Sequence, residues 1–144
     1  MESIVESPFK SISILYRKSH IWLNEACAGC GLTAAQAVVI LIVCDFKVLT
    51  QDDITKRLGM DKSVIAKTVT KLLDAGFVTR TTNPKDKRTY DIQPTDKAWN
   101  VYPFVSEQLE ICFQRMTSQM SPQQREAFKQ LLLLAGETAI NLDE

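Results

Sequence analysis

The hydrophobic pattern predicts a helical chain whose first helix is amphipathic. Between Phe9 and Ala26, apolar side chains recur at the three- to four-residue spacing of a helix face, and that face should need a partner. Two glycines in the segment Cys27–Gly31 end the pattern. Thr33 and Gln36 then have the spacing of a capping box, so we expect the next helix over residues 34–45, apolar on nearly every side and therefore buried. The stripe on the first helix consists of Phe9, Ile12, Tyr16 and Leu23.

Residues 50–75 have the pattern of a helix-turn-helix. A cap at Thr50 begins a short helix, a turn at Gly59 ends it, and Asp61 should cap a second helix over residues 62–75. One arc of the second helix is apolar and the opposite arc is polar and basic, which is typical of a helix-turn-helix. The inward arc consists of Ile65, Val69, Leu72 and Gly76, and the outward arc of Ser63, Lys67, Thr70, Lys71 and Asp74.

A two-stranded hairpin should follow this second helix. Residues 77–82 and 88–92 are rich in β-branched and aromatic side chains, and residues 83–87 between them have the Asn, Pro and Asp of a turn. The tip of the hairpin is basic. A basic hairpin directly after a helix-turn-helix is a wing.

Two further helices are predicted after the hairpin. The first opens near Thr95 and runs to about Gln119, with a bend or an interruption at Pro103. Ser121, followed by Pro122 at the first helical position, begins the second. The expected fold class is therefore mainly α with a small β-hairpin wing.

The composition is that of an ordinary globular protein. At 144 residues, 45% hydrophobic and 24% charged, the chain fits one compact domain with or without helical arms, and intrinsic disorder is excluded. The longest apolar run, residues 37–44, is too short to cross a bilayer, and residues 1–6 lack the features of a signal peptide. We therefore expect a cytoplasmic protein whose four cysteines are reduced.

The net charge of zero hides an uneven distribution of charge along the chain. Residues 51–90 contain nine basic and five acidic side chains, a net charge of +4, and the rest of the chain carries −4. A basic middle between acidic flanks favours one surface that binds a polyanion such as DNA.

Four short motifs carry a resemblance to a known family. They are Leu32-Thr33-x-x-Gln36, Leu58-Gly59-Met60-Asp61-Lys62-Ser63, Leu72-x-x-x-Gly76-x-Val78-x-Arg80 and Asp86-Lys87-Arg88. In this order and spacing they resemble the MarR family of bacterial transcription regulators over nearly the whole chain. The resemblance implies a homodimer, with a winged helix-turn-helix DNA-binding domain at 32–94 and a helical dimerisation region at 1–31 and 95–144. It also implies a repressor on a pseudo-palindromic operator, released by a small-molecule effector.

The helix-turn-helix and the wing supply the candidate DNA contacts. Ser63 and Lys67 should read base edges and Val64 should pack on a thymine methyl. Lys71, Lys62 and Thr70 should contact phosphates, which position the helix. Arg88 fits a minor groove, and Asp86 should orient Arg88 through a charge-assisted hydrogen bond without touching DNA. The full set is Lys62, Ser63, Val64, Lys67, Thr70, Lys71, Lys85, Lys87 and Arg88.

The cysteines and the single histidine leave one alternative open. Cys27 and Cys30 form a C-x-x-C, so a thiol-based redox-sensing regulator is an alternative. A zinc site would need further ligands, and His20 is the only histidine, so we expect no metal and no cofactor. Cys44 and Cys112 should lie in the core. Because catalytic motifs are lacking, we expect no enzyme. A winged-helix module that binds another protein instead of DNA is the remaining alternative.

Aromatic side chains mark a candidate effector pocket. An aromatic-lined cleft would suit a small aromatic or phenolic ligand, and Arg17 could pair with a carboxylate. The alternative is that these aromatic side chains simply build the dimer core. The candidates are Tyr16, Arg17, His20, Trp22, Phe46 and Tyr102, with Phe104 nearby.

Overall fold

The computed structural model describes residue 3 and residues 6–142. Positions 1, 2, 4, 5, 143 and 144, which belong to the predicted dimerisation region, lie outside the described residues. The described part is mainly helical with a small antiparallel sheet, as the sequence predicts. The elements are α1 (Pro8–Cys27), the 3-10 turn η1 (Ala28–Cys30), α2 (Ala34–Phe46), β1 (Leu49–Thr50), α3 (Gln51–Leu58), α4 (Lys62–Asp74), β2 (Val78–Thr82), β3 (Tyr90–Pro94), α5 (Asp96–Met116) and α6 (Pro122–Ile140).

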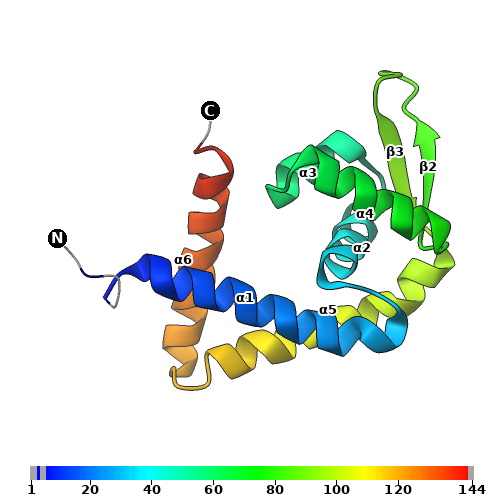
Figure 1. The fold of residues 1–144 in the computed structure, drawn as a ribbon. Helices are drawn as coiled ribbons and strands as arrows, with labels where there is room; N and C mark the ends of the chain where they lie inside the picture. Colours follow the sequence, from blue (N-terminus) through cyan, green and yellow to red (C-terminus); the bar gives the residue numbers. More distant parts are fainter. Residues whose placement is uncertain (1–2, 4–5, 143–144) are drawn as a thin grey trace.

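The elements form a winged helix-turn-helix body with helical arms (Figure 1). Helices α1 and α5 pack against each other and against α2, which in turn packs on α3, α4 and β3. The wing, β2 and β3, stands beside α4 and projects away from α1 and α5 (Figure 1). Helix α6 leaves the end of α5 and rises on the opposite side of the molecule from the wing.

Local capping chemistry starts three of the helices as predicted. The Thr33 hydroxyl accepts a hydrogen bond from the Gln36 amide at 3.2 Å, and the Gln36 side chain accepts one from the Thr33 amide at 3.0 Å. Thr50 begins α3 and Ser121 begins α6 with the same reciprocal pair of bonds. Asp61 was expected to cap α4, and this is wrong for its side chain. It occupies the N-cap position, but only its backbone carbonyl is used, accepting from Ile65 at 3.0 Å.

The sheet differs from the predicted two-stranded hairpin. A third strand, β1, pairs with β3 through Leu49 opposite Ile92, so the order is β1-β3-β2. Two residues are too short a strand to give a periodic signal. The central strand β3 begins at Tyr90 instead of at residue 88, because Arg88 still belongs to the turn.

Helix α5 runs through Pro103 without the interruption that the sequence suggests. Proline removes one backbone hydrogen bond from a helix. The packing of α5 against both α1 and α2 keeps the helix continuous there.

The core is centred on α2, as its apolar sequence predicts. Val39, Ile40 and Val43 are fully buried, and they pack with inward side chains of α3, α4 and the sheet such as Ile54 and Ile92. No single helix among the described residues is long and apolar enough to cross a membrane. Among the described residues, only α1 with η1 and α2, taken together across a bend of 78°, is long and apolar enough for a membrane span, and this holds by length and composition alone.

Candidate nucleic-acid interface

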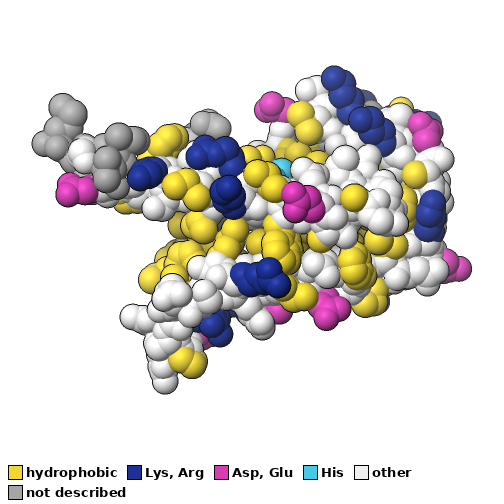
Figure 2. All heavy atoms as spheres, turned by 60° about the horizontal axis from the view of Figure 1, so that its bottom comes forward, with side chains coloured by type: hydrophobic (Ala, Val, Ile, Leu, Met, Phe, Trp, Pro, Cys, Tyr) yellow, Lys and Arg dark blue, Asp and Glu magenta, His cyan; other side chains and the backbone are white. Residues whose placement is uncertain are grey.

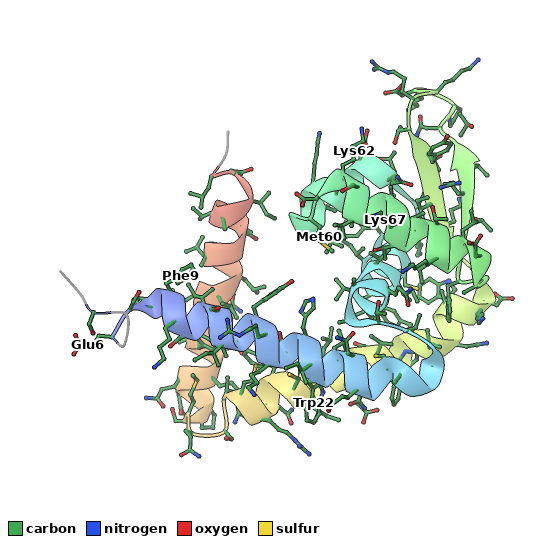
Figure 3. All side chains as sticks on the ribbon, viewed as in Figure 1. Glu6, Phe9, Trp22, Met60, Lys62 and Lys67 are labelled. Carbon is green, nitrogen blue, oxygen red and sulfur yellow. The ribbon has the colours of Figure 1, made fainter. Side chains whose placement is uncertain are left out.

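Helix α4 buries one face in the core and exposes the other. Ile65, Val69 and Leu72 are buried, with Thr68 beside them. Figure 3 places Lys62 at the start of the helix and Lys67 farther along it, and both side chains are exposed. The predicted DNA-contacting side chains of α4 all lie on this exposed side, namely Lys62, Ser63, Val64, Lys67, Thr70 and Lys71.

Thr70 is less free to bind phosphate than its neighbours. Its hydroxyl donates to the Ala66 carbonyl within α4 at 2.9 Å. A phosphate contact from the Thr70 proton would therefore have to replace this bond. The lysines on the same face have no such competing bond to the helix.

The C-terminal end of α4 is clamped by the start of α5, a feature that sequence reasoning missed. The Thr95 hydroxyl donates to the carbonyls of Gly76 and Phe77, at 2.6 and 3.0 Å. The Lys97 ammonium donates to the Ala75 carbonyl at 2.6 Å and lies 4.4 Å from the centre of the Phe77 ring. A cation at the end of a helix also complements the helix dipole. These contacts fix the direction of α4 relative to α5.

The wing tip presents an ion pair to solvent. Arg88 donates to both carboxylate oxygens of Asp86, at 3.0 Å from Nε and 3.3 Å from Nη2. The Arg88 side chain is nevertheless 90% exposed. These hydrogen bonds hold the pKa of the Asp86 carboxyl below its usual value, so the acid stays charged. Lys85 and Lys87, the residues before and after Asp86, are exposed. The contact expected from the sequence is present, and its role in DNA binding stays a prediction.

Within the C-x-x-C, Cys27 does not have the environment of a reactive thiol. Cys27 is buried and Cys30 is half-buried, and both are free thiols. Burial, and secondarily the neighbouring Cys30, raises the pKa of the Cys27 thiol, whereas redox sensors need a lowered pKa. Cys44 and Cys112 are buried, as expected. Within residues 6–142, no three His, Cys, Asp or Glu side chains gather as metal ligands.

The candidate effector residues do not line one cleft. Tyr16 packs against His20 with the two rings tilted by 38° and their centres 4.4 Å apart, and Arg17 donates to the Ser13 hydroxyl on the same helix. Trp22 lies near α5 instead, with the Arg115 guanidinium 4.7 Å from its ring centre.

The other candidates lie on the winged-helix side of the molecule. Phe46 is covered by the Arg57 guanidinium at 4.1 Å from its ring centre. Tyr102 donates a hydrogen bond to Asp45, which raises the pKa of the Tyr102 hydroxyl. Phe104 is 39% exposed. The aromatic residues therefore fall into separate clusters.

A hollow lies between α1, α5 and α6, where Figure 2 shows hydrophobic side chains gathered between the helical arms. Its volume is about 360 Å³, and of the predicted effector residues it contains only Tyr16. Trp22 lines a separate hollow of about 250 Å³ with Lys18 and Arg115. Sequence reasoning missed most of the hollow between α1, α5 and α6 because its walls come from three separate helices. Its lining residues are Ile12, Leu15, Tyr16, Ser19, Leu109, Cys112, Phe113, Met116, Phe128 and Leu132.

Comparison with known proteins finds a family that matches the central part of the chain. Residues 31–89, from the start of α2 to the wing tip, match the MarR family. No curated protein sequence matches the chain significantly.

Three solved structures share the fold. A MarR transcriptional regulator from Methanosarcina mazei Go1 is 24% identical with a TM-score of 0.86, over 92% of this chain and 96% of that chain. A MarR protein from Peptoclostridium difficile is 20% identical with a TM-score of 0.88, over 98% and 93% of the two chains. A mutant MarR from E. coli complexed with operator DNA is 22% identical with a TM-score of 0.76, over 88% and 91%.

Proposed function

We propose that the chain is a MarR-family winged helix-turn-helix DNA-binding transcription regulator that binds a specific operator through α4 and the wing. The observation that carries the proposal is the set of exposed basic side chains on the outer face of α4 and at the tip of the adjoining wing. Both elements are held rigidly, α4 by the core and the α5 clamp, and the wing by its sheet. A rigid basic surface of this kind matches the phosphates and the grooves of duplex DNA.

The contacts divide by their place on this surface. Ser63, Val64 and Lys67, in the first half of α4, read base edges in the major groove. Lys62, Thr70 and Lys71 contact phosphates and set the register of the helix. Lys85, Lys87 and Arg88 reach the neighbouring minor groove from the wing tip.

Homodimerisation completes the site, and residues 1–31 and 95–144 form the dimerisation region. Large apolar side chains on α1 and α6 are exposed in the single chain, including Phe9 at 68% and Leu131 at 64%. Exposed apolar surface of this extent is typical of a partner interface. A second copy covers it and places two α4 helices on successive major grooves of one operator.

The regulator acts as a repressor that a small molecule releases. The hollow between α1, α5 and α6 is walled almost wholly by apolar side chains, with Tyr16 and Ser19 as its polar groups. This lining favours an uncharged aromatic or phenolic effector over an aromatic acid, because Arg17 lies outside the hollow and bonds to Ser13.

Selection from a random-sequence DNA pool tests the proposal. The purified full chain should enrich a pseudo-palindrome whose half-sites are centred about one helical turn apart. Enrichment of no sequence would leave the exposed basic face to a protein partner and would refute sequence-specific DNA binding.

A further inference from the structure

Asn83 lies directly after β2, where the chain enters the tip of the wing, and its side chain bonds in two directions. Its Oδ1 accepts hydrogen bonds from the backbone amides of Lys85 and Asp86, each at 2.9 Å. Its Nδ2 donates to Oδ1 of Asp91 on β3 at 2.7 Å. The Asn83 backbone amide separately donates to the Thr89 carbonyl at 3.1 Å. One half-buried side chain thus ties the tip of the wing to its opposite strand.

The same bonds control the residue that orients Arg88. Asn83 fixes the backbone amide of Asp86, and the Asp86 carbonyl accepts from the Thr89 amide at 3.2 Å. The Asp86 carboxylate then accepts from the backbone amide of Arg88 at 3.1 Å as well as from its guanidinium. A continuous series of hydrogen bonds therefore runs from Asp91 through Asn83 and Asp86 to Arg88.

We propose that Asn83 is a positioning residue for DNA binding, which holds the wing tip in one conformation so that Arg88 is presented to the minor groove. The inference rests on the proposed contact of Arg88 with DNA. An exposed arginine that is already ordered loses less conformational entropy when it binds DNA, so binding is less costly. A tip without these side-chain bonds would sample several turn conformations, and Arg88 would have to be ordered by the DNA itself.

The chemistry at position 83 requires an amide. Its oxygen accepts from two backbone amides, and its nitrogen donates to a carboxylate. A carboxylate at position 83 could still accept the two amides, but it could not donate to the ionised Asp91 and would be repelled by it. Alanine would lose all three side-chain bonds. In either variant the backbone bond to Thr89 remains, so the wing strands and the fold should persist.

An exchange of the two partners tests this requirement. The variants are Asn83→Ala and the double variant Asn83→Asp with Asp91→Asn, in which the amide and the carboxylate change places. Wild type and both variants carry the same net charge, so a general electrostatic effect on DNA binding cancels. The probe is a duplex that the wild-type chain enriches from a random-sequence pool, with affinity measured by fluorescence anisotropy and thermal unfolding measured alongside.

We expect Asn83→Ala to weaken binding about tenfold with little change in melting temperature, and the exchanged pair to bind within about twofold of wild type. In an Arg88→Ala background, Asn83→Ala should cost little more, because Asn83 acts through Arg88. If Asn83 only stabilised the fold, Asn83→Ala would lower the affinity for DNA by the same factor in the wild-type chain and in the Arg88→Ala chain.

Three results would overturn the inference. They are wild-type affinity in Asn83→Ala, a double variant as weak as Asn83→Ala, and an undiminished loss in the Arg88→Ala background. A wild-type chain that enriches no duplex would overturn the proposed function as well, which distinguishes the two failures.

Discussion

The guanidinium of Arg88 is held by two hydrogen bonds to the carboxylate of Asp86, at 3.0 and 3.3 Å, while the arginine side chain stays 90% exposed. An ion pair this exposed adds little to folding stability, since water and salt screen it. The ion pair instead fixes the direction in which the Arg88 side chain points. The pair turns a long, flexible side chain into an ordered donor at the tip of the wing.

Replacing Arg88 should therefore weaken DNA binding and leave the fold unchanged. We expect Arg88→Ala to lower operator affinity by about ten- to a hundredfold, with an unaltered melting curve and an unaltered sedimentation coefficient. Arg88→Lys is the matched control: it keeps the charge, loses the two-pronged contact with Asp86 and should fall between the two. Equal affinities for wild type and Arg88→Ala would refute the role of the wing.

Two lysines on α4 should have separable effects. Lys67→Ala should change the preferred sequence, because Lys67 lies in the half of α4 that we propose to read bases. Lys71→Ala should weaken specific and random duplexes alike and reduce the slope of log affinity against log salt by about one. Binding to mutated half-sites across a salt series measures both effects. Equal losses on specific and random DNA for Lys67→Ala would remove it from the base-reading set.

Dimerisation should be lost when charge enters the exposed apolar faces of α1 and α6. Ile12→Glu and Leu132→Glu should each yield monomers by analytical ultracentrifugation and weaken operator binding strongly, since one subunit spans only one half-site. Lys10→Glu, which changes the charge on exposed α1 without removing an apolar contact, is the control. Two glutamate variants that stay dimeric would contradict the proposed interface.

Removing the whole first helix is a poorer test of dimerisation, because α1 also belongs to the core. Leu23 and Cys27 are buried, and the Asn24 side chain accepts a hydrogen bond from the Ala34 amide at 2.6 Å at the start of α2. A chain without α1 would lose these contacts as well as the interface.

The thiols should differ in reactivity in a way that tests the redox alternative. Burial, with a further contribution from Asp45, raises the pKa of the Cys44 thiol to about 11, so at pH 8 only about one molecule in a thousand carries its thiolate. The pKa values of Cys27 and Cys112 are raised by burial too. Alkylation of Cys44 should therefore increase as the pH rises toward 11.

Half-buried Cys30 should accordingly be alkylated first by iodoacetamide in the folded protein at pH 8, as followed by mass spectrometry of its peptides. Modification of Cys27 as fast as Cys30 would revive the C-x-x-C as a reactive pair. Loss of DNA binding after mild peroxide, abolished by Cys27→Ser or Cys30→Ser, would establish it as a sensor.

The elements of the fold were predictable wherever local chemistry decides them. Thr33, Thr50 and Ser121 start their helices with bonds to residues three positions along, so both partners are visible in the sequence. The inward and outward faces of α4 followed from helical periodicity alone, except that Gly76, predicted to face inward, lies beyond the end of the helix and is exposed. Strand β1 was missed because its two residues are ordered only by pairing with β3, more than forty positions away.

The contacts of the candidate site were likewise predictable only where they join residues that are close in the sequence. The bond between Asp86 and Arg88 joins residues two positions apart and could be expected from the sequence. The clamp of Lys97 on Ala75 spans 22 positions, and the bond of Asn83 to Asp91 crosses the wing, so both needed the register of the fold. The hollow between α1, α5 and α6 needed three helices to be placed together, and of the effector residues that aromatic content suggested, it contains only Tyr16.

The most direct test of the central claim is fluorescence anisotropy of the full chain on the DNA upstream of its own gene and on a scrambled duplex, across a salt series. We predict tighter binding to the upstream DNA, with log affinity falling steeply and linearly against log salt. Absence of binding to either duplex at low salt would contradict DNA recognition by α4 and the wing.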